Sequence, residues 1–520
     1  MTTNQGKAML ADGVFRQSEV VARLRAVLPA GSVLWQREDT RPYECDGLSA
    51  YRQLPMVVAL PRDEAEVMAV MRICAALKVP LVARGAGTGL SGGAYPHASG
   101  VLLSLAKMNR ILQLDPLARV ARVQPGVRNA AISEAAAPHG LYYAPDPSSQ
   151  IACSIGGNVA ENSGGVHCLK YGLTVNNVLR VRALVLGEGA GEGEGAGVGA
   201  DTSAGQRGQP EIIEFGSEAP DAPGLDMLAL LIGSEGMLAV VTEISVKLLP
   251  RPQLARCVLA AFDDVERAGE AVAAVIAAGI IPAGLEMMDQ PATHAVEQFV
   301  HAGYPMDAAA ILLCEADGTP EEVEEEIARM TEVLRGAGAT EFRISRDEAE
   351  RLRFWSGRKA AFPAVGRISP DYYCMDGTIP RKHLGRILRF IAQMETKYGL
   401  RCPNVFHAGD GNLHPLILFN ANDPDQLHRT EQFAAEVLEQ CIAVGGTVTG
   451  EHGVGIEKIN QMCQQFSAPE LAQFRALKLA FDPDGLLNPD KNIPSLHRCA
   501  EFGGMHIRGG ELPFPELPRF

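Results

Sequence analysis

PLVARGAGTGLSGGAYPHASGVLLSL, residues 80–105, places a glycine-rich loop between two apolar runs that have the length of buried strands. The loop holds five glycines in nine residues, from Gly85 to Gly93. Before it, residues 56–60 form another short, valine-rich strand, and residues 62–78 form a helix with one apolar face and a capping box at its start. The sequence therefore predicts a domain that opens strand, helix, strand, loop, strand.

The glycine loop matches the G-x-G-x-x-G pattern of dinucleotide-binding folds at Gly87, Gly89 and Gly92. That fold requires a helix to begin directly after the loop, because the helix N-terminus carries the pyrophosphate. Here residues 94–100 are turn formers and a strand follows, so the context excludes the Rossmann fold. A loop of this composition can still wrap a pyrophosphate with its own backbone N–H groups, and Arg84 adds a positive charge. A plain tight turn between two strands is the alternative.

Two further segments combine glycines with small polar residues. YYAPDPSSQIACSIGGNVAENSGGVHCLKYG, residues 142–172, is too polar for a core and too rich in glycine for a regular helix. IGSEGMLAVVTEI, residues 232–244, places two glycines just before a strand. Such segments suit close approach of the backbone to a large polar ligand.

The bulk properties restrict the class of protein. The 520 residues are too many for one core, and a net charge of −15 argues against nucleic acid or a strongly anionic membrane as partner. The eleven cysteines form no C-x-x-C pair, so iron–sulfur and zinc-ribbon spacings are not seen. The first residues lack a signal-peptide pattern, and the longest apolar run, 271–285, is shorter than the ~20 residues of a spanning helix. It is expected to form a buried helix and a turn. We expect a cytoplasmic protein whose membrane contact is only peripheral.

Four segments are expected along the chain: a lead-in over 1–50, a glycine-rich domain over 51–250, a second domain over 251–480 and a closing segment over 481–520. Residues 187–210, rich in glycine and glutamate, are interpreted as a flexible surface insertion. The fold class is α+β. In the second domain we expect helices at 263–279, 320–336, 381–398 and 424–444, and strands at 255–262, 309–316, 404–408, 413–419 and 447–450.

Two motifs in the second domain carry side chains that bind metals. NVFHAGDGNLHPLILF, residues 404–419, holds His407 and His414 on either side of strong turn formers, so a turn can bring the imidazoles together. In TVTGEHGVG, residues 447–455, glycines flank Glu451 and His452 and can bend the backbone so that adjacent side chains reach one site. Two histidines and a carboxylate form a standard divalent-metal site with an open position. Hydrogen-bonded histidines in a hairpin and an exposed Glu-His pair are the alternative.

The order of the three glycine-rich segments resembles the FAD-binding domain of the vanillyl-alcohol oxidase and p-cresol methylhydroxylase class. This resemblance implies a two-subdomain FAD-binding domain, an α+β cap domain with an antiparallel sheet, and a closing segment that returns to the FAD domain. Some members attach FAD covalently through a histidine in the first loop; Thr88 lies near that place here, so noncovalent FAD is implied. The resemblance places these residues at the cofactor: Arg84, Gly85, Ala86, Gly87, Thr88, Gly89, Asp146, Ser148, Ser154, Gly156, Gly157, Asn158, Asn162, Gly164, Gly165, Glu235, Gly236, Val240 and Asn412.

FHAGDGNLHP, GEHGVG and the later FDPDGLLNPDKNIP resemble the D-2-hydroxyacid dehydrogenase branch of this class. Residues 355–381 and the tail 499–520 are similar to the FAD-linked catalytic subunits of bacterial glycolate oxidases. The resemblance implies that His407, His414 and Glu451 bind the metal, with zinc expected. It also implies that His452 is the base and that Arg358 holds the substrate carboxylate.

The resemblance then implies that the chain oxidises a small 2-hydroxy acid, glycolate with D-lactate as a second candidate, to the 2-oxo acid, and that a quinone is the final acceptor. A second FAD-fold subunit and an iron–sulfur subunit are the expected partners, and the inner face of the plasma membrane is the expected place of peripheral contact. Two alternatives stay open: a stand-alone D-lactate dehydrogenase and a noncatalytic flavin electron-transfer subunit. A metal hydrolase that uses only the C-terminal half would leave the first 250 residues without a role.

Overall fold

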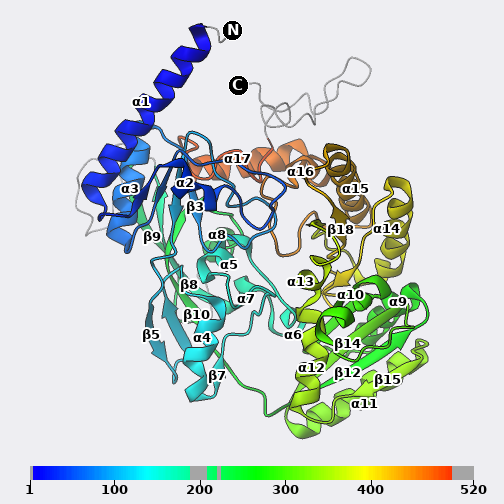
Figure 1. Ribbon diagram of the computed structural model, residues 1–520. Helices are drawn as coiled ribbons and strands as arrows, with labels where there is room; N and C mark the ends of the chain where they lie inside the picture. Colours follow the sequence, from blue (N-terminus) through cyan, green and yellow to red (C-terminus); the bar gives the residue numbers. More distant parts are fainter. Residues whose placement is uncertain (1–3, 188–207, 220–223, 495–520) are drawn as a thin grey trace.

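The computed structural model describes residues 4–187, 208–219 and 224–494, with side chains from Phe15 onward (Figure 1). Most of the predicted insertion 187–210 and the tail 499–520 lie outside the described residues. The chain forms two lobes that lie side by side in Figure 1, the first from blue to cyan and the second from green to yellow. None of the described helices is long and apolar enough to cross a bilayer.

The first lobe begins with a four-stranded sheet that carries the glycine loop at one edge. Its order is β1(Val33–Leu34), β2(Val57–Ala59), β4(Val101–Ser104), β3(Leu81–Arg84), and the last three strands are parallel. The connecting helix α3(Glu64–Leu77) begins where the Asp63 side chain accepts the N–H of Glu66, as the predicted capping box requires. The Glu66 carboxylate bonds the N–H of Arg62 and not that of Asp63, so only half of the box forms. The helix α1(Asn4–Val27) contacts α3 and β2.

A second, fully antiparallel sheet completes the first lobe. Its order is β5(Ile111–Asp115), β6(Val120–Val123), β10(Val240–Lys247), β8(Val178–Leu186), β9(Pro210–Gly216). Each of the two sheets has its own hydrophobic core. The shorter elements of this lobe are α2(Arg37–Thr40), α4(Asn129–Ala136), β7(Leu141–Tyr142), α5(Ile155–Glu161), α6(Cys168–Tyr171), α7(Thr174–Asn177), α8(Met227–Leu231) and β11(Leu249–Pro250).

The second lobe is built on an antiparallel sheet with helices on both faces. Its order is β15(Glu341–Ile344), β12(Leu254–Phe262), β14(Ala310–Gly318), β13(Gly284–Asp289), β17(Val405–Phe406). Alternate residues of β12 enter two different cores, as the period of a strand requires. One core includes α9(Val265–Ala277), α11(Pro320–Gly336), α14(Leu384–Tyr398) and α15(Pro424–Ala443); the other includes α10(Gln290–Val300), α12(Glu348–Lys359) and α13(Ala361–Val365).

The predicted helices of this lobe are confirmed, and so are the strands predicted at 255–262 and 309–316, which form β12 and β14, while the strands predicted at 404–408 and 413–419 are shorter than expected. Helix α11 has the predicted bounds. The apolar run 271–285 contains the last turns of α9, then a turn, and then the first residues of β13, so the predicted buried helix and turn are both present. Of the strand predicted at 413–419, only β18(Leu416–Phe419) forms, paired with β16(Asp371–Cys374). The strand predicted at 447–450 is wrong, because this backbone pairs at Thr447 alone and then turns its N–H groups toward a buried carboxylate.

The end of the described chain runs back to the glycine loop. After α16(Ile459–Gln465) and α17(Ala468–Phe481), the N–H of Leu81 donates to the carbonyl of Leu486, and the N–H of Asn488 donates to the carbonyl of Leu81. The Asn488 amide also donates to the carbonyl oxygens of Gly93 and Glu235. The closing residues of the second lobe therefore brace two of the three glycine-rich segments of the first.

Candidate active site

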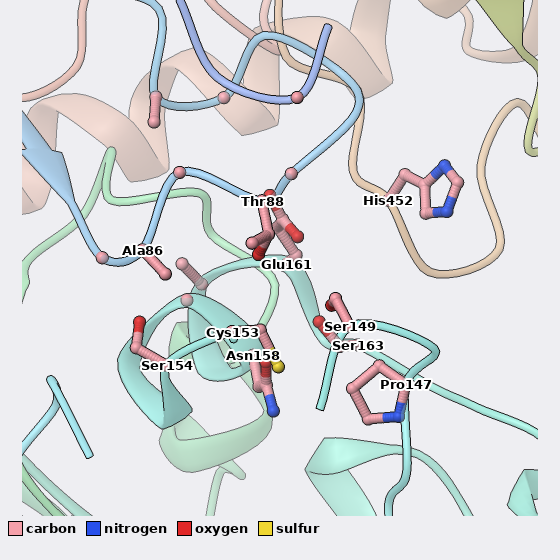
Figure 2. A pocket seen from close by; sticks show the side chains of 18 of the residues that line it. Ala86, Thr88, Pro147, Ser149, Cys153, Ser154, Asn158, Glu161, Ser163 and His452 are labelled. Carbon is pink, nitrogen blue, oxygen red and sulfur yellow. The ribbon is translucent and has the colours of Figure 1, made fainter. Parts of the chain in front are cut away.

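A cavity of about 520 Å³ runs along the glycine loop and ends at the histidines of the second lobe (Figure 2). All three glycine-rich segments contribute to its wall, which the sequence could only suggest. The predicted cofactor residues that line it are Arg84, Gly85, Ala86, Gly87, Thr88, Gly89, Ser148, Ser154, Gly156, Gly157, Asn158, Glu235 and Gly236.

The absence of side chains on the loop glycines lets the loop pack against α5. A Cβ atom on Gly85 would lie 2.1 Å from Ser154 Oγ, and Gly87 has a φ of +74° that favours glycine. Ser154 precedes α5 but makes no cap hydrogen bond. Its Oγ and the Asn158 Nδ2 are buried without a hydrogen-bond partner, and both residues line the cavity. Orphaned polar atoms in a cavity wall indicate a polar ligand.

Three predicted cofactor residues line neither this cavity nor the second one described below. Val240 is buried in the core of the sheet, and the Asn162 side chain accepts the N–H of Val175. The Asp146 carboxylate binds His167 Nδ1 at 2.9 Å, while His167 Nε2 contacts Glu315 of the second lobe at 3.2 Å. Although burial alone would lower the pKa of His167, the charges and hydrogen bonds of the two carboxylates raise it to about 10. Asp146 is therefore part of a bridge between the lobes, and its expected place at the cofactor stays a prediction.

The turn after β17 brings His407 and His414 together, as predicted. The N–H of His407 donates to the Asn412 carbonyl at 3.0 Å, and Gly411 has a φ of +81°. The two imidazole centroids lie 4.9 Å apart. Glu451 Oε1 lies 3.2 Å from His407 Nε2 and 3.3 Å from His414 Nε2. The three ligand atoms are thus grouped as one divalent ion requires.

His407 is held by a buried carboxylate that the sequence analysis missed. Glu286 Oε1 lies 2.8 Å from His407 Nδ1, and its Oε2 accepts from Arg358 Nε at 2.7 Å. Metal-binding histidines usually donate their second nitrogen in this way. The side chain of Arg358 is 1% exposed and lines neither this cavity nor the second one described below. Arg358 pairs with Glu286, while its Nη1 is buried without a hydrogen-bond partner, and its expected role as the substrate's carboxylate clamp stays a prediction.

Glu451 and His452 reach one site because of Asp376, another residue that the sequence analysis missed. The Asp376 carboxylate accepts the N–H groups of Gly450, Glu451 and His452, at 3.1, 3.2 and 2.8 Å. It also pairs with Lys458 Nζ at 3.1 Å, and both side chains are fully buried. Three consecutive N–H groups around one carboxylate form a tight bend. The flanking glycines permit this bend, and Asp376 fixes it.

His452 lines the first cavity beside the cluster of His407, His414 and Glu451. Its ring stacks on that of His414 with centroids 4.9 Å apart, and its Nδ1 is buried without a hydrogen-bond partner. Burial lowers the pKa of His452 to about 4, against the opposing charge of Asp376. The imidazole is thus neutral at pH 7 and can accept a proton.

A second cavity, of about 350 Å³, meets the first at Glu451. Gly164, Gly165, His407 and Asn412 line it, so three of the predicted cofactor residues face the second cavity and not the first. The N–H of Gly164 donates to Glu451 Oε2 at 3.0 Å, which explains why this part of the glycine-rich segment turns toward the cluster.

Comparison with known proteins identifies both lobes. Residues 55–190 match the model of an FAD binding domain, and residues 251–492 match the C-terminal domain of FAD linked oxidases. The chain is 59% identical to glycolate oxidase subunit GlcD of Escherichia coli (strain K12), over 97% of each chain. It is 30% identical to a D-lactate dehydrogenase of Anaerostipes hadrus, over 91% of this chain and 97% of that protein.

The fold has a counterpart among solved structures. Substrate-bound p-cresol methylhydroxylase superposes with a TM-score of 0.71 at 16% identity, over 91% of this chain and 96% of that one. The predicted fold class, an FAD-binding domain of this type followed by an α+β domain, is confirmed.

Proposed function

This chain belongs to the family of FAD-linked oxidases, and from that premise we propose that it oxidises glycolate to the 2-oxo acid, with D-lactate as a second substrate. Electrons then pass to a quinone-type acceptor. The observation that carries the proposal is the neutral His452 at the end of a cavity lined by the glycine loop, directly beside a two-histidine, one-carboxylate cluster. The glycolate oxidase subunit named above supports the choice of substrate.

FAD fits the first cavity, and the orphaned Ser154 Oγ and Asn158 Nδ2 are the polar atoms best placed to meet it. We infer that FAD is held noncovalently, because Thr88 occupies the loop where a histidine could attach to the cofactor. Among the described residues that line this cavity, the histidines are His414 and His452, both at the end occupied by the cluster. Bound FAD would supply the acceptor for the hydride of the substrate.

A divalent metal, with zinc expected, fits His407, His414 and Glu451. His414 Nδ1 and Nε2 are buried without a hydrogen-bond partner, which a metal ion would relieve at one nitrogen. Burial alone would lower the pKa of His407, but the charges of Glu286 and Glu451 raise it well above its usual range. The same carboxylates favour a cation at this position. Such an ion would supply Lewis acidity toward the substrate oxygen.

His452 is the proposed base. Its neutral ring can take the hydroxyl proton, and its place in the wall of the first cavity puts it between the cofactor domain and the cluster. Lys458, which pairs with Asp376, also lowers the pKa of His452. The buried cation thus helps to keep the ring unprotonated at neutral pH.

The chain is proposed to work within a complex. The word "subunit" in the name of the glycolate oxidase relative supports this, and the chain has no iron–sulfur spacing of its own. A second FAD-fold subunit and an iron–sulfur subunit are the proposed partners, with peripheral contact at the inner face of the plasma membrane through them. A stand-alone D-lactate dehydrogenase is the second candidate, supported by the D-lactate dehydrogenase relative. A noncatalytic flavin subunit would not need the cluster.

The test is anaerobic stopped-flow reduction of the FAD-loaded protein. Glycolate should bleach the flavin faster than D-lactate at equal concentration, and elemental analysis should find about one divalent metal per chain. Faster bleaching by D-lactate, with quinone reduction by the isolated chain, would favour the second candidate. Failure of every 2-hydroxy acid to bleach the flavin would refute the proposal.

A further inference from the structure

Glu161, a residue that the sequence analysis did not single out, places a carboxyl group in the wall of the first cavity (Figure 2). It is the last residue of α5, and its side chain is half-buried. A Cβ atom on Gly89 would overlap Glu161 Oε1, so the carboxyl group lies directly against the glycine loop. Glu161 therefore faces the same space as the loop that is expected to wrap the FAD pyrophosphate.

Among the residues that the structure describes, none donates a hydrogen bond to the Glu161 carboxyl group or forms an ion pair with it. Glu235, which lines the same cavity, differs in this respect. Its oxygens accept the N–H groups of Val454 and Gly455 at 2.8 and 2.7 Å and the side-chain amide of Asn492 at 2.6 Å. Such donors stabilise the charged form of a carboxyl group, and a carboxylate without them is costly to remove from water. Of the two groups, Glu161 is the one that the structure leaves to hold a proton.

The charges around Glu161 also favour its neutral form. Burial raises the pKa of Glu161 well above its usual range, and the carboxylates of Asp46 and Glu235 add to this rise. Asp376 acts in the same direction, and Lys458 acts in the opposite one. A pyrophosphate held by the glycine loop would add further negative charge at this position. The other charged side chains and histidines that line the cavity are Arg84, Lys359, His414, Glu451 and His452.

We propose that Glu161 is a neutral carboxylic acid in the FAD-loaded protein and donates a hydrogen bond from its hydroxyl group to the cofactor. An ionised carboxyl group can only accept hydrogen bonds and would repel the pyrophosphate, whereas the protonated group has one O–H donor. Glu161 thereby acts beside the unpaired Asn158 Nδ2 as a second donor in the cavity wall. This inference rests on the proposed function, because it takes FAD as the occupant of the first cavity.

Infrared spectroscopy of the FAD-loaded protein at neutral pH tests the protonation state. The difference between the wild type and Glu161→Gln should contain the C=O stretch of a protonated carboxyl group. This band should shift when FAD is removed by dialysis, because the hydroxyl group then loses its acceptor. The matched control is Glu134→Gln. Glu134 is exposed on α4 and lines neither cavity, so its difference spectrum should lack the protonated-carboxyl band.

Equilibrium dialysis of the protein against FAD gives a second readout, which does not depend on catalysis. Glu161→Gln is neutral and keeps an N–H donor, so its Kd for FAD should stay within about twofold of the wild type. Glu161→Ala removes the donor and should raise the Kd by about 3- to 10-fold, the range for one net hydrogen bond. Glu134→Gln should match the wild type.

Any of four results would overturn the inference and leave FAD as the cofactor. The first is a carboxylate band in place of the protonated one, and the second is a protonated band that FAD removal does not shift, because the acid then bonds only to the protein. The third is a Kd that Glu161→Ala does not change. The fourth is a Kd at least about tenfold lower in Glu161→Gln, the mark of a removed like charge. If the wild-type protein neither contains nor takes up FAD, the proposed function fails, and this inference fails with it.

Discussion

Replacing Asp376 by asparagine should damage stability and the active site together. The carboxylate is fully buried, pairs with the fully buried Lys458 at 3.1 Å, and accepts three successive N–H groups of the Glu451–His452 bend. Removing one partner of a buried ion pair typically costs about 3–5 kcal/mol. Glu457 lies 3.6 Å from Lys458 and offers a partial substitute, so we expect the lower end, about 3 kcal/mol. The amide can also accept fewer of the N–H bonds, which loosens the bend that positions Glu451 and His452.

Urea denaturation gives the free energy of unfolding, and elemental analysis and stopped-flow flavin reduction report on the site. Asp376→Asn should lose metal and slow flavin reduction by at least about tenfold, the cost of about 1.4 kcal/mol in the barrier. The double variant Asp376→Asn with Lys458→Met removes both charges, so it should regain stability relative to the single variant but not the metal. Surface changes usually alter the free energy of unfolding by no more than about 0.5 kcal/mol. This reasoning would be refuted if Asp376→Asn stayed within that range of the wild type and kept its full metal content.

Three further predictions follow from other contacts. His452→Ala should keep FAD and metal but reduce the flavin about 10²- to 10⁴-fold more slowly, whereas Glu451→Ala should lose metal and activity together; loss of metal from His452→Ala would exchange the two roles. Gly156→Ala should weaken FAD binding, measured by fluorescence titration, by at least about fivefold, because its Cβ would lie 2.5 Å from Pro125 Cβ and such overpacking costs about 1–3 kcal/mol; unchanged affinity would contradict the packing argument. His167→Gln should destabilise the protein at pH 6. The pKa of His167 is raised from 6.5 to about 10, so its contribution is full below pH 6.5 and is lost as the pH rises through about 10. Thermal denaturation of both forms should therefore show a difference that shrinks over this window, and a constant difference would argue against a charged bridge.

Local sequence signals were enough to predict the first strands and helix of the first lobe and the meeting of the two histidines in the cluster. Residues 56–105 contain periodic apolar runs, a helix cap and a glycine loop, all of which act over a few neighbours, and the structure follows them. The turn formers between His407 and His414 are local in the same sense. The prediction that these histidines meet therefore needed no knowledge of the rest of the chain.

Contacts between distant segments could not be read in the same way. Asp376 lies 75 residues before Glu451, and Glu286 lies 121 residues before His407, so no spacing rule joins them. Arg358 is one of three arginines in α12, and only the position of Glu286 on β13 decides that it turns inward. The bridge from Asp146 through His167 to Glu315 of the other lobe could not be predicted for the same reason, because His167 and Glu315 are 148 residues apart.

The loop that carries Glu451 and His452 is held from both lobes, and this makes the site a property of their junction. Asp376 of the second lobe binds the N–H groups before and at His452, while Glu235 of the first lobe accepts the N–H groups of Val454 and Gly455 at 2.8 and 2.7 Å. Ser91 of the glycine loop donates to the His452 carbonyl at 2.8 Å. Since the same glycine loop lines the cavity assigned to FAD, any shift of that loop on cofactor binding is passed directly to the backbone of the proposed base. The backbone around the proposed base is thus held in place by three side chains, Asp376 of the second lobe and Glu235 and Ser91 of the first.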